Sequence, residues 1–561
     1  MQKVWHIAPK QDDDLVTSIL LNRGIERDSI ARFLLPSWEN GTHDPFIFSQ
    51  MQKAVDRIFL AFDREQKIVI HGDYDADGVC GTSLLYGALK EVSPNVKLEA
   101  YLPDREKDGY GVAMHTVERL AAEGCGLLIT VDCGIANGLE LERAHELGMD
   151  VIVCDHHQLG QHFPTKAIVL HPGAPGESYP NKVLCGTGVA FKLATALFSE
   201  ARKRGAVIPE GYEKWMLDLV GIATVTDVMP LVGENRVLEF YGLKVLQKTR
   251  RDGLKAILHH SGTSTAIDTD VIGFRIGPRL NAAGRMSSAR HAFNVLVAQG
   301  EEAMLHAARL EELNRERQDV FTVAYKEAQA QIKDNANPFS LAVYAPHWSP
   351  GIIGLIAGRL VADFRVPAFA FTKVGEHIVG SGRSIGGLHL VKAMETMPPE
   401  IFVRRGGHPQ ACGLTLYNAE GVDVFRDELE RRAQEHFGPQ GVIDTLAIDG
   451  VLTPSSVDED IHARLSSLGP FGEGHRPPIF AVCDVTIDEL ARMGGSGSHL
   501  RLTVREPQGS AVKFVGFGFG NLADELKIGQ SIDIAYSVGI NEWQGRREVQ
   551  FKIIDYRISS K

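Results

Sequence analysis

The sequence lacks the features that mark membrane-spanning, secreted or nucleic-acid-coating proteins. No apolar run reaches the roughly 20 residues that span a bilayer. The first residues, MQKVWHIAPKQDDDLV, lack the basic and then apolar stretch of a signal peptide. The seven cysteines are an odd number with no CxxC pair, which favours free thiols in a reducing compartment. With 59 basic against 71 acidic residues, the net charge of −12 disfavours non-specific coating of nucleic acid. We therefore expect a cytoplasmic protein without a membrane segment.

The chain of 561 residues is too long for one hydrophobic core, and its pattern changes along its length. From about residue 67 to residue 230, apolar strand-like runs alternate with helical patterns, which predicts a parallel α/β sheet. The segment 301–334 has neither Gly nor Pro and predicts one long helix that connects two domains. The predicted strands of the sheet are 67–71, 97–102, 127–131, 150–154 and 167–170.

A second α/β segment is predicted at about 339–437, and the texture changes again from about residue 443. There the chain consists of short alternating runs separated by Gly-bearing turns, such as HLRLTVRE and AVKFVGFGF, which predict a small β-barrel. The predicted domains are an N-terminal extension (1–50), a catalytic α/β domain (51–300), the long helix (301–335), a substrate-binding α/β domain (336–440) and a nucleic-acid-binding barrel (441–561).

Polar side chains follow the ends of several predicted strands. The run KIVIHGDYDADG places three carboxylates at alternate positions directly after a buried strand, where they repel each other unless a cation neutralises them. The runs LLITVDC, VIVCDHH and GIATVTD end in further acidic or histidine residues. Because parallel sheets bind ligands at the carboxyl ends of their strands, we expect these groups to converge. They are Asp73, Asp75, Asp77, Asp132, Asp155, His156, His157 and Asp227.

Each of these elements alone has an ordinary explanation. A single Asp after an apolar run is usually a turn or capping residue, and a His pair on a loop usually faces solvent. Several such elements at one sheet edge favour a metal site, because two divalent cations would nearly balance the gathered carboxylates. Oxygen ligands with an imidazole suit Mn²⁺ or Mg²⁺ better than Zn²⁺. Two such ions activate water for in-line displacement at phosphorus, so the predicted chemistry is phosphoester hydrolysis.

The motifs GDYDADG, TVDCG, DHHQL and TVTDVMPL, in this order, resemble the DHH phosphoesterase superfamily. The fuller set resembles the RecJ family of bacterial single-strand-specific 5′→3′ DNA exonucleases, with DHH, DHHA1 and OB-fold domains. The resemblance implies two bound Mn²⁺ or Mg²⁺ ions, with Asp132 as the bridging ligand. His157 would contact the scissile phosphate or a bound water, and Asp155 would ligate or orient a ligand. The implied ligands are Asp75, Asp77, Asp132, His156 and Asp227, and Asp73 is a further ligand or a residue that orients one. His71 has the spacing of a ligating histidine in pyrophosphatases of the superfamily, and its role stays open.

Arginine- and glycine-rich stretches further along the chain predict phosphate contacts. The segment PRLNAAGR resembles the RecJ pattern and makes Arg279 a candidate for binding the phosphate being cut, since guanidinium pairs with phosphate oxygens bidentately. The Gly-rich segments VGSGRS and RRGGHPQACG let backbone N–H groups approach an anion, and RRGGHPQACG resembles the DHHA1 domain, whose implied role is to hold the 5′ end of the substrate. The predicted substrate-binding residues are Arg105, Arg279, Ser381, Arg383, Arg405, Gly407, His408 and Gln410.

The barrel adds a set of less specific candidates. Single strands bind OB-folds through basic grooves and aromatic stacking. We interpret the alternating Phe514, Phe517 and Phe519 as core residues rather than a stacking platform. The polar and aromatic candidates for strand contact are Arg492, Arg501, Lys513, Trp543, Arg546 and Arg547.

The predicted protein is therefore a metal-dependent exonuclease that degrades single-stranded DNA from the 5′ end to 5′-mononucleotides, in DNA repair and recombination. Single-stranded DNA, single-strand-binding protein and a helicase are the partners implied by the resemblance, and a monomer is expected. One alternative is a DHH–DHHA1 phosphodiesterase of short oligonucleotides or (cyclic) nucleotides, but such proteins generally end after their second domain. The other alternative is an inactive DNA-binding scaffold, against which the intact acidic and histidine set argues.

Overall fold

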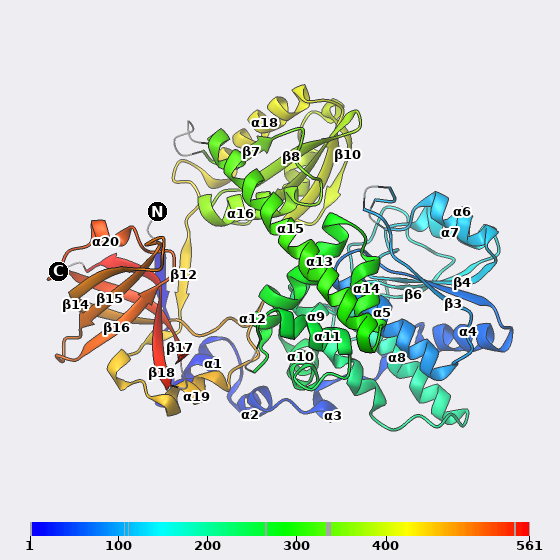
Figure 1. Cartoon of the computed structure of the whole chain (residues 1–561), viewed down its shortest axis with the longest axis horizontal. Helices are drawn as coiled ribbons and strands as arrows, with labels where there is room; N and C mark the ends of the chain where they lie inside the picture. Colours follow the sequence, from blue (N-terminus) through cyan, green and yellow to red (C-terminus); the bar gives the residue numbers. More distant parts are fainter. Residues whose placement is uncertain are drawn as a thin grey trace. The chain divides into compact units, whose positions relative to one another are not determined.

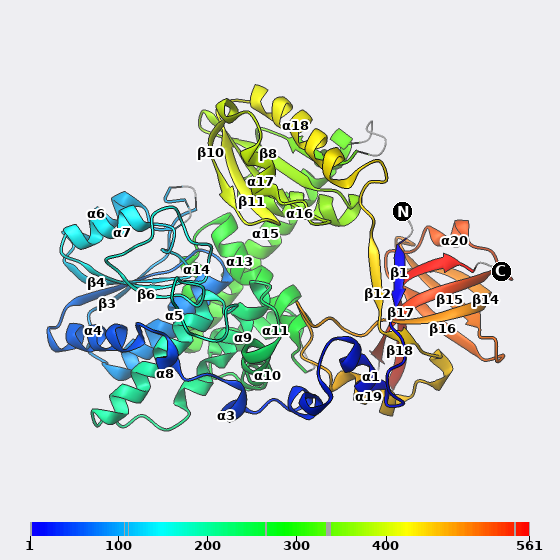
Figure 2. The same cartoon turned by 180° about the vertical axis from the view of Figure 1, so that it is seen from behind.

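The computed structural model describes residues 3–559 apart from 106, 110, 264–265, 333–337 and 544–545. The chain forms two compact units. The larger unit comprises Trp38–Val442 with Gly472–Gly474. The smaller unit comprises Met1–Ser37, Ile443–Phe471 and His475–Lys561. Figures 1 and 2 show the elements of both units from opposite sides. Among the described helices, none combines the length and apolar character that crossing a bilayer requires.

A five-stranded, fully parallel sheet forms the first part of the larger unit. Its strands are β2 (Lys67–His71), β3 (Leu98–Tyr101), β4 (Cys125–Val131), β5 (Asp150–Cys154) and β6 (Ile168–Leu170), in the order β3-β2-β4-β5-β6. The β-branched run of β2 suits a strand that is covered on both faces, and Ile68, Val69 and Ile70 are fully buried. This arrangement confirms the predicted parallel sheet.

Helices cover both faces of this sheet. They are α4 (Met51–Asp63), α5 (Ala76–Val92), α6 (Met114–Ala122), α7 (Gly138–Glu146) and α8 (Gly186–Lys203). Figure 2 shows α6 and α7 above the strands and α4 and α8 below them. The chain passes from β2 outward to β3 and then returns across to β4, so the strand order reverses at β2. Such a switch point opens a crevice at the carboxyl ends of the strands, which is where ligands bind in these folds.

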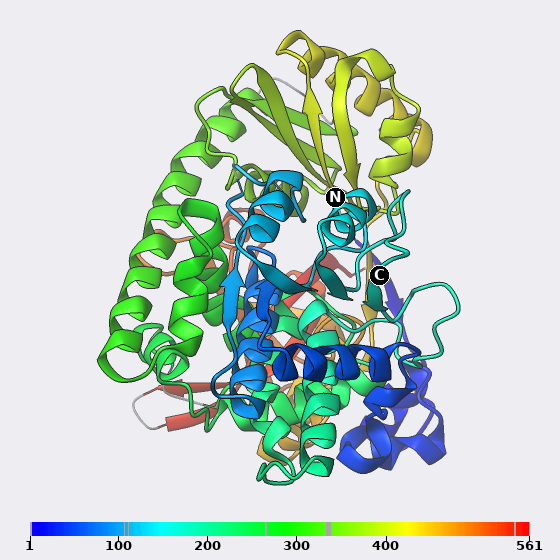
Figure 3. The same ribbon diagram turned by 90° about the vertical axis from the view of Figure 1, so that its right-hand side faces the viewer.

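A helical region packs against α5 and leads into one long helix. It consists of α9 (Leu217–Thr226), α10 (Gly233–Leu246), α11 (Asp252–His260), α12 (Thr269–Val271), the π-helical turn η4 (Ile272–Ile276), α13 (Gly277–Met286) and α14 (Arg290–Val297). The long helix α15 (Gly300–Ile332) then runs unbroken towards the second sheet (Figures 1 and 3). Leu310 and Leu313 pack into the first core, whereas Ala328 and Ile332 pack into the second. Burial at both ends makes α15 a structural connector, as predicted.

The second α/β domain has a mixed sheet. Its elements are β7 (Leu341–Tyr344), α16 (Ile353–Phe364), β8 (Ala368–Val374), β9 (His377–Arg383), α17 (Leu390–Glu395), β10 (Phe402–Gly407), β11 (Ala411–Leu416) and α18 (Glu420–Phe437). The order is β10-β11-β9-β8-β7, with only β7 and β8 parallel. The pairing of β9 with β11 sets Ser381 opposite Gly413 and Arg383 opposite Ala411. The two Gly-rich stretches therefore form neighbouring strands.

The smaller unit is a closed β-barrel. Its strands are β13 (Gly450–Val451), β14 (Phe480–Met493), β15 (His499–Arg505), β16 (Ala511–Gly516), β17 (Ser531–Trp543) and β18 (Arg546–Ile558), in the order β13-β14-β15-β16-β18-β17, and β14 also pairs with β17. The closing β14–β17 pairing turns the sheet into the predicted barrel. Phe480, Phe514 and Tyr536 are fully buried at its centre.

The N-terminal segment belongs to the barrel unit, which the sequence analysis did not anticipate. Strand β1 (Val4–Ile7) pairs in parallel with β12 (Thr445–Ile448), and the buried Ile19 and Leu20 of α1 (Leu15–Asn22) join the barrel core. Two segments more than 400 residues apart in the chain are thus held together by backbone hydrogen bonds and apolar burial.

Candidate metal centre

Three groups of carboxylates and imidazoles lie at the carboxyl ends of β2, β4 and β5. The first contains Asp132, His156 and His157, the second Asp77, His156 and Asp227, and the third Asp73, Asp75 and Asp132. Within each group the candidate ligand atoms lie within 4.8 Å of one another. Asp132 belongs to two groups and His156 also to two, so the groups are contiguous. The structure therefore brings together all six residues predicted as ligands, and His157 with them.

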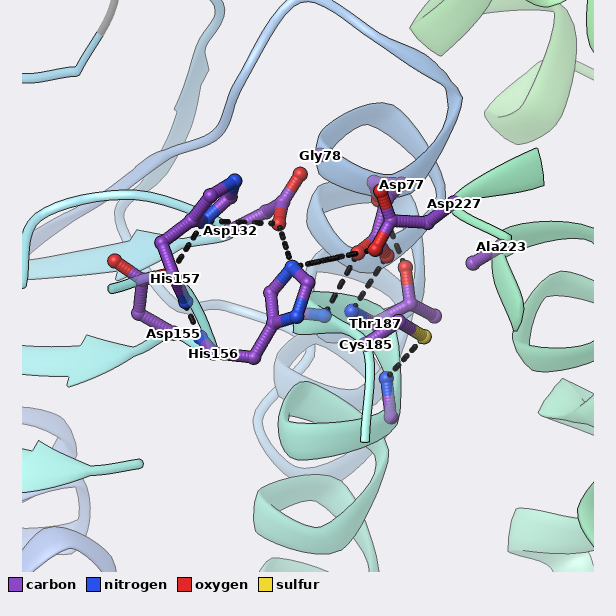
Figure 4. A network of polar contacts seen from close by, with 12 residues as sticks. Asp77, Gly78, Asp132, Asp155, His156, His157, Cys185, Thr187, Ala223 and Asp227 are labelled. Atoms are coloured by element: carbon purple, nitrogen blue, oxygen red, sulfur yellow. Dashed lines mark hydrogen bonds and ion pairs between the residues drawn. The ribbon is translucent and has the colours of Figure 1, made fainter. Parts of the chain in front are cut away.

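His156 lies at the centre of this cluster. Its Nε2 is 3.1 Å from Asp132 Oδ1, 3.4 Å from Asp227 Oδ2 and 3.7 Å from Asp77 Oδ2. Figure 4 shows the ring between Asp132 on one side and Asp77 with Asp227 on the other. Burial lowers the pKa of His156 to about 4, so the imidazole is neutral at physiological pH. A neutral imidazole nitrogen surrounded by carboxylates is a competent metal ligand.

Backbone N–H groups hold the aspartates of the first motif in place. Asp75 is the N-cap of α5 and accepts hydrogen bonds from the amides of Asp77 and Gly78. Asp77 accepts from the amides of Gly186 and Thr187, at 2.7 Å each, at the N-terminus of α8. Two helix N-termini thus fix two carboxylates beside the strand ends.

Two glycines allow the loops to approach each other. A Cβ on Gly186 would lie 2.6 Å from the Cβ of Asp132, and a Cβ on Gly78 would lie 2.4 Å from the backbone nitrogen of Asp73. Asp132 itself has a left-handed φ of 63°, a conformation that Asp tolerates better than most residues and that often marks functional sites. The cluster therefore depends on close backbone packing as well as on the ligand side chains.

The negative charges of the clustered carboxylates are not balanced by the protein groups around them. Burial and the charge of Asp75 raise the pKa of Asp73 to about 8. Burial and the charges of Asp77 and Asp75 raise the pKa of Asp227 to about 9. Asp73 Oδ1 and Asp227 Oδ2 are buried and make no hydrogen bond. Buried carboxyl oxygens without a hydrogen-bond donor need either a proton or a cation. Two Mn²⁺ or Mg²⁺ ions fit this set of oxygen and imidazole ligands.

Asp155 and His157 form a second kind of pair within the site. Asp155 Oδ1 accepts from the amides of His156 and His157 and lies 2.8 Å from His157 Nδ1, and Oδ2 accepts from the amide of Ile135. Burial alone would raise the pKa of Asp155, but His157 and these N–H groups hold it well below its ordinary value. Burial likewise lowers the pKa of His157, but Asp155 and the nearby carboxylates raise it to about 9. Asp155 thus orients a positively charged His157.

His71 is buried behind the cluster rather than within it. It belongs to none of the three ligand groups among the described residues, and its Nε2 makes no hydrogen bond. Its Nδ1 lies 3.7 Å from Cys133 Sγ, and burial lowers its pKa to about 4. The geometry gives His71 a packing environment of Cys133 and the Tyr101 ring.

Helix α13 carries the segment PRLNAAGR and braces the metal loop. Asn281 Oδ1 accepts a hydrogen bond from the amide of Ala76, and a Cβ on Gly284 would lie 2.3 Å from Tyr74 O. Arg279 forms an ion pair of 2.6 Å with Glu311 of α15. Arg105 lies over the Tyr74 ring, 4.4 Å from its centroid. Helix α13 thus packs on the loop that carries Asp73 and Asp75 through Asn281 and Gly284, and Arg105 contacts the same loop through Tyr74.

Arg285 was missed by the sequence analysis. Its Nη1 donates to Gly351 O, and no carboxylate pairs with it among the described residues. Burial and the charges of Arg105 and Arg383 lower its pKa to about 9. Arg285 stands in the same PRLNAAGR segment as Arg279, and that segment is the sequence signal that could have revealed it. The charges of Arg105, Arg285 and Arg383 thus repel one another, and none of the three forms an ion pair with a carboxylate among the described residues, which favours an anion beside them.

The second domain brings some of its predicted residues to the cluster and not others. The His408 ring lies 5.8 Å from the His157 ring, and Arg383 Nη1 donates to Ser381 Oγ at 3.3 Å. Gly407 has a φ of 130° and closely approaches Cys412 on the neighbouring strand. Arg405 instead donates to Met394 O, inside its own domain. Gln410 is exposed, and its carbonyl accepts from the amide of Ser384.

One expectation for the barrel is wrong and two lie outside the described side chains. Phe514 is fully buried as expected, but Phe517 is 54% exposed and lies edge-on against His499, because it stands in the turn after β16 rather than within the strand. Arg501, Lys513 and Arg547 are exposed, and Arg492 pairs with Asp524. The side chains of Trp543 and Arg546 are not among those described.

Comparison with known proteins matches all three parts of the chain. The DHH family N-terminal domain matches residues 67–224, the DHHA1 domain residues 337–435 and the RecJ OB domain residues 448–555. The single-stranded-DNA-specific exonuclease RecJ of Bacillus subtilis is 35% identical over 99% of this chain and 68% of its own length. The Escherichia coli protein of the same name is 31% identical over 98% of this chain and 96% of its own length.

Solved structures agree with these relatives. The crystal structure of RecJ in complex with Mn²⁺ from Thermus thermophilus superimposes with a TM-score of 0.83 at 26% identity, covering 100% of this chain and 80% of that one. A manganese-bound exonuclease RecJ gives a TM-score of 0.60 at 30% identity over 70% of this chain and 96% of that one. Sequence, domain order and fold together show that the chain belongs to the RecJ family.

Proposed function

We propose that this protein is a metal-dependent exonuclease that hydrolyses single-stranded DNA from the 5′ end and releases 5′-mononucleotides. The observation that carries the proposal is the contiguous cluster in which Asp132 and His156 each belong to two ligand groups. When bound there, two Mn²⁺ or Mg²⁺ ions would supply a hydroxide nucleophile and offset negative charge at the phosphate. The names of the relatives, which are single-stranded-DNA-specific exonucleases, support the substrate class.

Different residues around the cluster bind two different phosphates of the strand. His157, positively charged and oriented by Asp155, donates a hydrogen bond to the phosphate that is cut. Arg279 on α13 adds positive charge for that phosphate while its Nε pairs with Glu311. The terminal 5′ phosphate lies among Arg105, Arg285 and Arg383, which repel one another and form no ion pair with a carboxylate among the described residues. A phosphate there offsets guanidinium repulsion just as cations offset the carboxylates.

The 5′→3′ direction of cleavage follows from this position of the terminal 5′ phosphate. When the 5′ phosphate occupies the arginine group, the next phosphorus along the strand lies at the acidic cluster, and the 3′ oxygen of the first nucleotide leaves. His408, beside His157, closes the same region from the second domain. A strand end without a 5′ phosphate lacks one ionic contact and is expected to bind more weakly.

A direct test uses single strands labelled at the 5′ or the 3′ end, with Mn²⁺, Mg²⁺ or EDTA. We expect mononucleotides from the 5′ label first and no product in EDTA. Asp132→Asn should abolish cleavage because it removes the shared ligand, whereas Asp150→Asn, at the opposite end of β5, should cleave normally. Early release from the 3′ label would refute the direction, and cleavage in EDTA would refute the metal requirement.

Comparing substrates separates this proposal from a phosphodiesterase of short oligonucleotides or cyclic nucleotides. We expect higher kcat/KM on a strand of several tens of nucleotides than on a dinucleotide, because the closed barrel provides a further binding surface for a long strand. Equal kcat/KM values would favour the alternative. The proposal also includes roles in DNA repair and recombination, a cytoplasmic monomer, and contacts with single-strand-binding protein and a helicase. Sedimentation alone and with each purified partner tests the last two.

A further inference from the structure

Two local irregularities lie beside the metal-centre residue Asp227. Directly after it, Val228 has a φ of 56° and is 62% exposed. A left-handed φ is a genuine outlier for a β-branched residue. Residues Ile272–Ile276 form the π-helical turn η4 between α12 and α13. Single π-turns are uncommon and occur frequently at functional sites. Backbone strain of this kind is retained where the surrounding structure enforces it, often next to bound ligands.

The two irregular segments are packed together. A Cβ on Gly277 would lie 2.5 Å from Thr226 Cγ2, so α13 begins in close contact with the last residue of α9. A Cβ on Gly273 would lie 3.9 Å from Val225 Cγ1. Within the turn, Ile272 and Ile276 are fully buried in the main core. The π-turn is therefore anchored on the end of the helix that presents Asp227.

Phe274 does not share the burial of its neighbours in this turn. At 77% exposure it is the most exposed phenylalanine in the described part of the chain, although its neighbours Ile272 and Ile276 are completely buried. Burying a phenyl ring stabilises a fold by about 2–3 kcal/mol, so an exposed ring on a fixed turn contributes nothing comparable to folding. Isolated exposed apolar residues are common, and exposure by itself assigns no role. The position of this ring, between a metal-centre helix end and a phosphate-binding segment, supplies the assignment.

The residues that follow Phe274 are suited to the backbone of a nucleic acid. Arg275 is exposed, with its guanidinium held by Ser261 O and Thr263 Oγ1. Arg279 lies one turn further on, and its Nη1 donates to Arg275 O. A nucleotide has a charged phosphate and a flat apolar base. The segment from Phe274 to Arg279 offers a ring for the base and two guanidinium groups for the phosphate, one of which, that of Arg279, also pairs with Glu311.

We propose that Phe274 binds the substrate strand by stacking on a nucleobase next to the phosphate at the metal centre. This inference rests on the proposed function and extends it to the base. Stacking on an aromatic ring tolerates every base because each has a π-face, which suits an enzyme that degrades strands of any sequence. The π-turn presents the ring at the end of α9 without loosening the buried Ile272 and Ile276.

The test uses strands that lack bases. Oligonucleotides with a 5′ phosphate are compared with matched strands carrying abasic residues at the first three positions, in Mn²⁺. Wild type should show a kcat/KM about 5- to 150-fold lower on the abasic strand, the range that corresponds to one stacked base. Phe274→Ala should lose a similar factor on the normal strand, mainly through KM, and should no longer distinguish the two strands. Phe274→Trp should restore both values.

A matched control and a binding measurement keep the outcome decisive. Leu305 is 71% exposed on α15, and Leu305→Ala should leave both kcat/KM values unchanged. Phe274→Ala should melt at the wild-type temperature because the ring is not in the core. If Phe274→Ala keeps the wild-type discrimination, the stacking role is wrong while the exonuclease proposal stands. If wild type cleaves no single strand, the exonuclease proposal fails instead. In that case the fluorescence difference between Phe274→Trp and wild type, which has five native tryptophans, is measured with oligo-dT and Ca²⁺, and a difference that oligo-dT does not quench overturns the inference.

Discussion

Replacing Asp227 by Asn should stabilise the protein when metal is absent and destabilise it, relative to wild type, when metal is present. Asp227 is the C-cap residue of α9, and its carboxyl Oδ2 is buried and makes no hydrogen bond. Its repulsion with Asp77 and Asp75 is relieved only by a proton or a cation. Asn has the same shape without the charge.

The magnitude follows from the pKa of Asp227, which is about 9 in the folded protein against 3.8 for an ordinary Asp. The folded state therefore binds the proton more tightly than the unfolded state, and in EDTA its stability falls as the pH rises from about 4 to about 9. At pH 7 the loss is about 4 kcal/mol, at 1.36 kcal/mol for each pKa unit. A buried amide with unmet hydrogen bonds costs about 1–3 kcal/mol. The variant should thus gain about 1–3 kcal/mol in EDTA.

Thermal unfolding in EDTA and in saturating Mn²⁺ measures this change. The melting temperature of a unit of this size shifts by about 1 °C for each kcal/mol of unfolding free energy. Asp227→Asn should therefore melt about 1–3 °C above wild type in EDTA at pH 7. In Mn²⁺ wild type should melt above the variant, because ligand binding stabilises the folded state and the variant has lost a ligand. Asp150→Asn, a half-exposed control on β5, should show no such crossing. The reasoning is refuted if Asp227→Asn melts below wild type in EDTA, or if Mn²⁺ raises both proteins equally.

Three further predictions concern buried charges. Glu239 is fully buried without a hydrogen-bond partner for either carboxyl oxygen, and burial raises its pKa, so the protein loses stability as the pH rises above about 4.5. Glu239→Gln should reduce this loss, measured by urea unfolding at pH 5 and pH 8, and an unchanged pH dependence of stability would contradict the prediction. Lys192 Nζ and Glu234 Oε1 form a buried ion pair of 2.6 Å, so Lys192→Met should lower the free energy of unfolding by about 3–5 kcal/mol, and the double variant Lys192→Met with Glu234→Leu should lower it less. A single variant within about 1 kcal/mol of wild type would show that the pair is dispensable. Arg285→Met should raise KM for 5′-phosphorylated strands by about 10- to 100-fold and for 5′-hydroxyl strands by much less, and equal increases would argue against a 5′-phosphate contact.

The part of the site formed by residues directly after the strands could be predicted from the sequence. β2, β4 and β5 read as apolar runs, and each is followed by the acidic or histidine residues that meet in the cluster. Parallel strands share one carboxyl edge, so the order of motifs along the chain already implied that Asp73, Asp132 and His156 would be close. The long helix was equally predictable, since 33 residues from Gly300 to Ile332 contain no internal Gly or Pro.

Other features depended on contacts that no local pattern records. Asp77 is held by amides at the start of α8, more than 100 residues away, and Asp227 reaches the cluster from the end of a helix rather than a strand. Arg285 looked like one more basic residue until its neighbours Arg105 and Arg383 were in place. Phe517 looked like a core residue of an alternating strand, but the strand ends at Gly516.

The sequence by itself determined the parallel sheet, the long connecting helix, the barrel and the ligand types, because hydrophobic periodicity and strand-end chemistry are local properties. The tertiary structure alone decided which carboxylates share His156, which arginines repel one another and that Phe274 stays exposed on an anchored turn. It also decided that β1 pairs with β12 across most of the chain. Burial, charge–charge distance and long-range pairing depend on where distant segments meet in space, and a linear pattern does not contain that information.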